Sequence, residues 1–191
     1  MRVLAVILFA SIFLSLLACR DVTPELIEPI PHDTIITVET NPWTTAASYG
    51  CDPCGRYKVM IFADGTVIYD GVDSVGKLGV ARLKITTDDV RAILAEFEKI
   101  KFFKLRDTYD IGDNDCRNPV GHGWRMITSI QIDGKSKTIR HYTHCPNFEG
   151  DQEGTAINRL ELKIEKITGV EKWVDPRLID LKINKTVRPD K

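Results

Sequence analysis

The chain has 191 residues, with 26 basic and 27 acidic side chains and a formal net charge of −1 at pH 7. This near balance gives no electrostatic basis for nucleic acid as a partner, because proteins that neutralise phosphates carry a clustered excess of positive charge. The length suits one domain with a sizeable hydrophobic core.

Residues 1–18 have the pattern of a secretory signal peptide. Arg2 precedes an apolar run from Val3 to Leu17, and a small residue stands before Cys19. The run is shorter than the roughly 18 to 20 residues needed to cross a bilayer, so we expect export rather than a retained transmembrane helix. The run ends in Leu-Leu-Ala-Cys, which resembles the bacterial lipobox and predicts lipid attachment at Cys19. A plain signal peptide followed by an incidental cysteine is the alternative.

Residues 19–33 are expected to form a tether between the lipid and the domain. This segment has no periodicity, and it contains Pro24, Pro29 and Pro31. Proline-rich segments are extended and semi-rigid. The predicted location is the bacterial cell envelope, with the lipid holding the protein on a membrane. Arg20, rather than an aspartate, follows Cys19, which favours the outer membrane.

The rest of the chain predicts a single α+β domain over residues 34–174, followed by a polar tail at 175–191. Asp64-Gly65 and Asp133-Gly134 have the residue types of tight hairpin turns between alternating strands. The expected elements are a strand at 34–40, a hairpin at 57–71, a strand at 79–85, a helix at 87–100, a hairpin at 124–143 and a helix at 154–168. Two hairpin-plus-helix units predict an antiparallel sheet with the helices packed on one face.

Local signals support both predicted helices. Thr86 and Asp89 approximate a capping box, and Gly169 supplies a stop. Apolar residues recur at helical spacing in each segment. The expected core-facing residues are Val90, Ile93, Leu94, Phe97 and Ile100 in the first helix, and Ile157, Leu160, Ile164 and Ile167 in the second.

With Cys19 assigned to lipid, an even number of cysteines remains, which favours disulfides in an exported protein. These are Cys51, Cys54, Cys116 and Cys145. A tight turn at Asp133-Gly134 would set a register that brings position 122 opposite Cys145. A Cys116–Cys145 bridge is then sterically easy and leaves Cys51 to pair with Cys54. The crossed pairing, in which Cys51 and Cys54 each bond a distant cysteine, stays open.

Five stretches carry a family resemblance. They are Cys51 with Cys54-Gly-Arg-Tyr57, "DGTVIYDG", "ITTDDVRAILAEFEKIKFFKLRDTY", "KTIRHY" and "INRLELKIEKITGVEKWV". Over about residues 34–174 the chain resembles a bacterial family known only as a domain of unknown function, numbered 6438. The cysteine segment of that family usually reads Gly-Cys-x-x-x-Cys-Pro-x-Tyr, whereas here the gap is one residue shorter and Gly55 replaces the proline. The resemblance implies frequent export or lipid anchoring, and it brings no activity or catalytic residues.

The Cys51-Asp-Pro-Cys54 segment has the spacing of a dithiol redox motif. A reactive cysteine usually has its thiolate stabilised at a helix N-terminus after a strand. Here the pair precedes a predicted strand, so we expect a structural disulfide. A zinc site that recruits these cysteines with His122 or His144 is disfavoured, because the paired Cys-x-x-Cys spacing occurs once.

The other chemically suggestive residues have ordinary interpretations. Crowded carboxylates suit a hard cation such as calcium, but the spacing here is not that of an EF-hand, and we expect a solvated acidic loop. Its members are Asp107, Asp110, Asp113 and Asp115. His141 is expected opposite Met126, half-buried on the core side of the sheet as a structural residue. Most aromatic residues should lie in the core, with Trp43 and Tyr49 as candidates for recognition.

The anchor, the tether and the even number of cysteines predict a lipid-anchored envelope protein that acts as a non-catalytic binding or interaction module. Its partner would be another envelope protein or a small ligand, and we assign no cofactor, catalytic residue or metal ligand. The alternative is an envelope enzyme. That enzyme would be a thiol-disulfide oxidoreductase using Cys51 and Cys54, or a metal-dependent hydrolase using the aspartate loop with His122.

Overall fold

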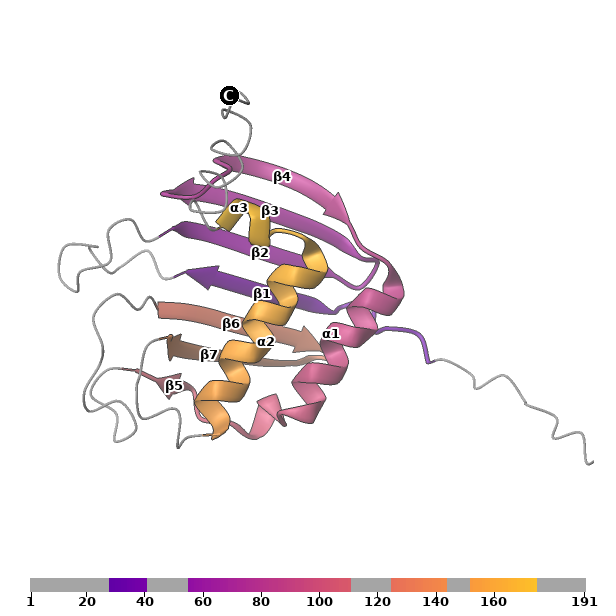
Figure 1. Ribbon diagram of the computed structural model, residues 1–191. Coiled ribbons are helices and arrows are strands. Elements are labelled where there is room, and N and C mark those ends of the chain that lie inside the picture. The colour runs from indigo at the N-terminus through magenta and orange to yellow at the C-terminus, as the bar shows by residue number, and fades with distance from the viewer. Residues whose placement is uncertain (1–27, 41–54, 111–124, 144–151, 175–191) are drawn as a thin grey trace, which may run out of the picture.

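A computed structural model describes residues 28–40, 55–110, 125–143 and 152–174 (Figure 1). Cys19 and the other four cysteines lie outside these residues. None of the helices within them combines the length and the apolar character needed to cross a membrane.

A seven-stranded sheet forms one layer of the domain, in the order β4-β3-β2-β1-β6-β7-β5. The strands are β1 (Ile35–Thr40), β2 (Arg56–Phe62), β3 (Thr66–Asp73), β4 (Gly79–Lys84), β5 (Thr108–Tyr109), β6 (Arg125–Ile132) and β7 (Lys135–Tyr142). Neighbours pair antiparallel except β5, which pairs parallel to β7. The predicted α+β class is therefore confirmed, and the sheet is mixed at this one edge. The short β5 lies in a stretch that the sequence predicts as an irregular acidic loop.

Both predicted hairpin turns are present. Gly65 and Gly134 have φ angles of 82° and 67°, the left-handed region that favours glycine. The turn at Asp133-Gly134 places Ile132 opposite Lys135 and continues in register to the far end of the hairpin. The register predicted from the turn is therefore confirmed for the described residues.

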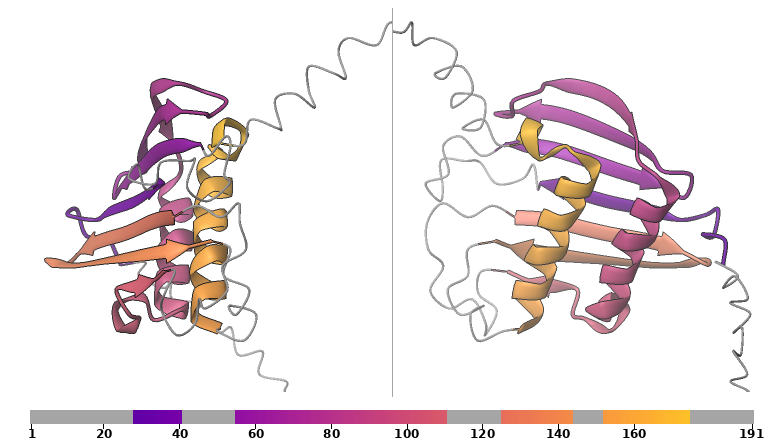
Figure 2. Two further views of the ribbon diagram at one scale, coloured as in Figure 1. Left: turned by 90° about the vertical axis from the view of Figure 1, so that its left-hand side faces the viewer. Right: turned by 45° about the vertical axis from the view of Figure 1, so that its right-hand side comes forward.

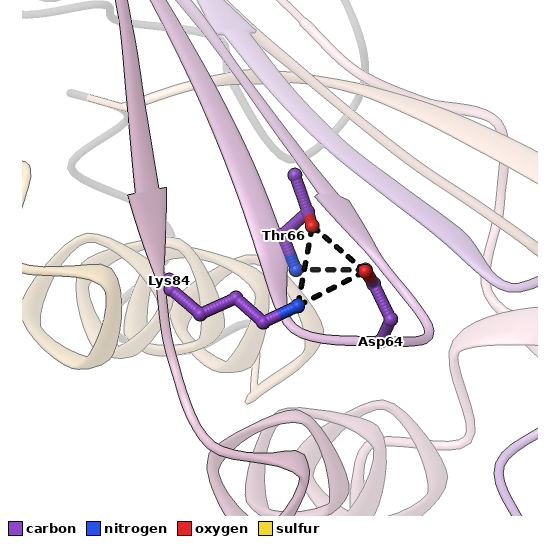
Figure 3. A network of polar contacts seen from close by, with 3 residues as sticks. All are labelled: Asp64, Thr66 and Lys84. Atoms are coloured by element: carbon purple, nitrogen blue, oxygen red, sulfur yellow. Dashed lines mark hydrogen bonds and ion pairs between the residues drawn. The ribbon is translucent and has the colours of Figure 1, made fainter.

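The turn between β2 and β3 is tied to the edge strand β4 (Figure 3). The carboxylate of Asp64 accepts hydrogen bonds from the backbone N–H of Thr66 at 2.9 Å and from its hydroxyl at 2.8 Å. Lys84 on β4 donates to the same carboxylate at 2.9 Å. These bonds stabilise the charged form and lower the pKa of Asp64 to about 2.

The helices cover one face of the sheet (Figure 2). They are α1 (Thr87–Lys99), the 3₁₀ turn η2 (Phe102–Lys104), α2 (Gln152–Thr168) and α3 (Glu171–Val174). Thr86 and Asp89 form the predicted capping box at the start of α1, and Gly169, with a φ of 70°, follows α2. Lys163 on α2 donates to Glu96 on α1 at 2.7 Å, which links the two helices.

The hydrophobic core lies between this helical layer and the sheet. Strands β1, β2 and β6 alternate buried and less buried residues, as expected for strands covered on one face. The predicted helix stripes supply Val90, Ile93, Phe97, Ile157, Leu160 and Ile164 as buried residues. Polar side chains are buried among them on α2 and on the strands beneath it.

The described domain begins within the segment that the sequence predicts as tether. Ile30 packs against the hydrophobic core. The carboxylate of Asp33 accepts hydrogen bonds from the backbone N–H groups of Asp133 and Gly134, at 3.2 and 2.8 Å. The chain is therefore fastened to the tip of the β6–β7 hairpin before β1 begins.

Candidate functional site

Two glutamates on α2 face the core instead of solvent. Glu161 is 1% exposed and Glu165 is 8% exposed. They are four residues apart and lie beside Leu160 and Ile164, so they share the helix face that packs on the sheet. Carboxyl groups buried to this degree need hydrogen-bonding partners or a change of protonation state.

Glu161 connects α2 to two neighbouring strands. The hydroxyl of Thr128 on β6 donates to Oε1 of Glu161 at 2.8 Å. Nδ1 of His141 on β7 lies 3.2 Å from Oε2 of the same carboxylate. Thr128 and His141 are themselves buried on the helix-facing side of the sheet. The two carboxylate oxygens thus have partners on different strands.

Glu165 connects the same helix to β2. The hydroxyl of Tyr57 donates a hydrogen bond to Oε1 of Glu165. Burial, together with repulsion from the nearby Glu161, raises the pKa of Glu165 to about 7 in spite of this hydrogen bond. Burial and the adjacent Glu165 also raise the pKa of Tyr57 well above its ordinary value. The hydroxyl of Tyr57 therefore keeps its proton and remains a hydrogen-bond donor, whereas Glu165 gains and loses a proton near neutral pH.

Aromatic packing continues from this cluster toward the C-terminal helix. The ring of Tyr57 stacks on that of Tyr69 with centroids 6.2 Å apart, and Tyr69 contacts Trp173 of α3 at 5.1 Å. The prediction that most aromatic residues lie in the core is confirmed for Tyr57, Tyr69 and Tyr142. The buried carboxylate cluster, defined as Tyr57, Thr128, His141, Glu161 and Glu165, is thus enclosed by packed side chains. It can hold a proton at Glu165 and secure α2 to the sheet, and each of its members is at most 8% exposed.

A groove provides an open site elsewhere on the domain. It has a volume of about 770 Å³ and lies between α1, η2, the tip of the β6–β7 hairpin and residues 28–31. Its apolar lining includes Leu94, Phe97, Ile130 and Ile132. Its charged lining comprises Arg91, Lys101, Lys104 and Lys135 together with Glu28, Glu98 and Asp133. This α1 groove combines an apolar surface with charges of both signs.

The predicted acidic loop is only partly within the described residues. Asp107 forms an ion pair with Lys137, and the Nε–H of Arg125 is shared between the two carboxylate oxygens of Asp110, at 2.8 and 2.7 Å. Both aspartates are therefore neutralised by cations on the sheet. Among the described residues no group of three or more His, Cys, Asp or Glu side chains is placed to hold a metal ion.

His141 lies opposite Met126 on the core side of the sheet, as predicted. The expectation that it is half-buried is wrong, because it is only 1% exposed. Its partner Glu161 is not among the residues that the sequence predicted for a site. Glu161 and Glu165 are four residues apart and adjacent to core-facing residues of the helix, which is the sequence signal that could have indicated their burial. Charged residues in such positions usually reach solvent, so the signal is weak.

The remaining predicted site residues belong to parts of the chain outside the described ranges. Cys19, the four other cysteines and the aromatic candidates Trp43 and Tyr49 lie outside the described residues. So do the second half of the acidic loop, with Asp113 and Asp115, and the two histidines suggested as zinc ligands, His122 and His144.

Comparison with known proteins identifies the family. A search of the curated proteins found no match. The model of the domain of unknown function DUF6438 matches residues 45–168, a range that contains every member of the buried carboxylate cluster. Residues 28–31, which line the α1 groove, precede it. The chain therefore belongs to the DUF6438 family, as its sequence motifs predicted.

Proposed function

We propose that the chain is a lipid-anchored protein of the bacterial cell envelope, held on the outer membrane through Cys19, and that its domain acts by binding rather than by catalysis. The observation that carries the binding role is the contrast between its two polar sites. The buried carboxylate cluster is closed and fastens α2 to the sheet, whereas the α1 groove is open. The partner in that groove is a small ligand or a segment of another envelope protein.

The lining of the groove supports one class of ligand. Leu94 and Ile132 offer apolar contact, and Arg91, Lys101 and Lys104 offer cations near it. A ligand with an apolar body and an anionic group satisfies both features, because an anion buried without a cation would be poorly solvated. The groove also borders residues 28–31, where the chain arrives from the proposed anchor.

Disulfide bonds remain part of this proposal, and the described strand ends support it. Thr40, Arg56, Arg125 and Tyr142 all lie at one end of the sheet, on the adjacent strands β2, β1, β6 and β7. Three inter-strand spacings of about 4.8 Å separate β2 from β7. Cys54 precedes Arg56 by two residues, and Cys145 follows Tyr142 by three. These spans are short enough for a bridge between Cys54 and Cys145, which belongs to the crossed pairing, and they leave the predicted pairing open.

The direct test is mass spectrometry of the protein extracted from native membranes, with free thiols alkylated before digestion. We expect acyl chains on Cys19 and full-yield bridges joining Cys51 to Cys54 and Cys116 to Cys145. An unmodified Cys19 would contradict the anchor. Free or mixed-state thiols at Cys51 and Cys54 would contradict the structural role of that pair and favour the thiol oxidoreductase.

The binding role is tested separately by isothermal titration with dodecanoate, which has an apolar chain and one carboxylate. We expect binding that is lost when Ile132, in the groove, is changed to Glu. The matched control is Leu162→Glu, because Leu162 is an exposed residue of α2 away from the groove. Equal loss in both variants, or no binding by the unaltered chain, would contradict a groove ligand of this class.

A further inference from the structure

The chain between α1 and β5 forms a turn that displays positive charge around one exposed phenylalanine. This basic turn, residues 99–106, contains four basic residues and no acidic residue: Lys99, Lys101, Lys104 and Arg106. Phe102 and Leu105 are buried and fix the turn to the core, and the ring of Phe102 meets that of Phe97 edge to face at 4.8 Å. Phe103, between them, is 42% exposed.

Two cations of the turn, Lys101 and Lys104, are available to an external partner, whereas Lys99 pairs with Glu96 and Arg106 lies over the ring of Tyr109. Lys101 and Lys104 are exposed and form no ion pair with any residue that the structure describes. Lys101 has a φ of 54° and its backbone N–H bonds to the carbonyl of Glu98, so the chain reverses direction there. Lys101 and Lys104 flank Phe103 in the sequence, and all three side chains are exposed.

The turn lies beside the segment that leads to the proposed anchor. Residues 28–31 line the α1 groove together with Lys101, Phe103 and Lys104. Cys19 precedes Glu28 by nine residues, which span roughly 30 Å at full extension. A lipid on Cys19 therefore keeps the basic turn within a short distance of the membrane that holds the lipid.

We propose that the basic turn docks the domain on the anionic headgroups of that membrane, with Phe103 inserted at the interface. Lysine and arginine side chains near an anionic leaflet are attracted to its surface charge, and an aromatic ring beside them is stabilised at the level of the headgroups. The carboxylates of Glu28, Glu98 and Asp133 in the groove would be repelled, so the contact is made by the turn and not by the whole groove. This inference rests on the proposed lipid anchor, but the surface can be tested without it.

The experiment uses the mature chain, residues 19–191, with Cys19→Ser so that no lipid contributes. Its binding to vesicles is measured by co-sedimentation at low salt, with phosphatidylcholine alone and with an equal mixture of phosphatidylcholine and phosphatidylglycerol. We expect binding to the anionic vesicles only, weakening as salt is added. The double variant Lys101→Asn with Lys104→Gln should bind about 25-fold more weakly, because each cation contributes about fivefold. Asparagine is chosen at 101 because it tolerates a positive φ.

The matched control removes two cations elsewhere, by Arg82→Gln with Lys166→Gln. Arg82 lies on β4, at the opposite edge of the sheet from the β5 edge that the turn leads into, and both residues are exposed. This control variant should bind the anionic vesicles within twofold of the parent chain. The variant Phe103→Ser should bind them more weakly without a lower melting temperature. Equal loss in the two double variants, equal binding to both vesicles, or no binding would overturn the inference.

Sedimentation of the same chain without vesicles tests the competing occupant, a second copy. A dimer that is abolished by Phe103→Ser would also overturn the membrane contact. The anchor is tested by a different measurement, the mass spectrometry of Cys19. If the chain binds anionic vesicles but Cys19 from native membranes is unmodified, only the proposed anchor is refuted. If Cys19 is lipidated but the chain does not bind the vesicles, only this inference is refuted.

Discussion

The hydroxyl of Tyr57, on β2, donates a hydrogen bond to Glu165, on α2, across the core of the domain. The two residues are 108 positions apart in the chain. Tyr57 directly follows the segment that carries Cys51 and Cys54, so this bond connects the start of β2 to the last turns of the second long helix. The protonation of Glu165 near neutral pH therefore affects how strongly α2 is attached to the sheet.

The stability of the domain should fall as pH rises from about 4.5 to about 7, and Glu165 should cause much of the fall. Its pKa is raised to about 7 in the folded protein from an ordinary value near 4.5 in the unfolded chain. A raised pKa means that the folded state binds the proton more tightly, so the stabilisation is present below pH 4.5 and is lost between about pH 4.5 and 7. The loss is about 3 kcal/mol, to order of magnitude.

Urea denaturation at intervals from pH 5 to pH 8 measures this dependence. Glu165→Gln keeps a hydrogen-bonding side chain but removes the titration, so the variant should show a much flatter profile. An unchanged slope in the variant would assign the dependence to other groups.

His141 and Glu161 should show strong energetic coupling. His141→Phe leaves the Glu161 carboxylate buried with one fewer partner, and we expect a loss of about 3 kcal/mol in the free energy of unfolding. Glu161→Met alone should cost about 1 to 3 kcal/mol, because it removes a buried polar partner from both His141 and Thr128. The double variant should be more stable than His141→Phe alone, because no buried carboxyl group is then left short of a partner. Strictly additive losses in this double-mutant cycle would show that the two side chains do not interact.

The two hairpin glycines should differ in their tolerance of alanine. A Cβ at Gly65 would lie 2.3 Å from the carbonyl oxygen of Ile85, whereas a Cβ at Gly134 would meet nothing within 4 Å. Both positions have positive φ, which costs about 1 kcal/mol for alanine. Gly134→Ala should therefore lower stability by about that amount, and Gly65→Ala by at least 1 to 2 kcal/mol more. Equal melting temperatures for the two variants would contradict the close approach at Gly65.

The proposed Cys116–Cys145 bridge should stabilise the domain measurably. It would close a loop of about 30 residues, which corresponds to roughly 3 to 4 kcal/mol in the chain-entropy model. Cys145→Ser should therefore lower the melting temperature of the oxidised protein, and reductant should lower that of the unaltered chain in the same way. Cys51→Ser should also lower stability. Variants that melt like the unaltered chain would argue that these thiols are not bridged.

The sequence by itself determined the local structure of this protein. Alternating strands around Asp64-Gly65 and Asp133-Gly134 were sufficient to predict both hairpins, because a two-residue turn dictates the pairing of every residue behind it. The capping box at Thr86 and the stop at Gly169 gave the limits of the helices to within a few residues. These features depend on residues close together in the chain, whose preferences are visible in any short stretch.

Only the tertiary structure decided which side chains meet across the core. The order of the strands in the sheet places Tyr57, Thr128 and His141 against one face of α2. No short stretch of sequence predicts that order. Glu161 and Glu165 look like ordinary surface residues in the sequence, and they are buried because α2 lies across the sheet with this face inward. The same long-range packing fastens Asp33 to the β6–β7 turn and pairs β5 with β7. Burial, and with it the pKa of a carboxyl group, is a property of the assembled layers and not of the residue.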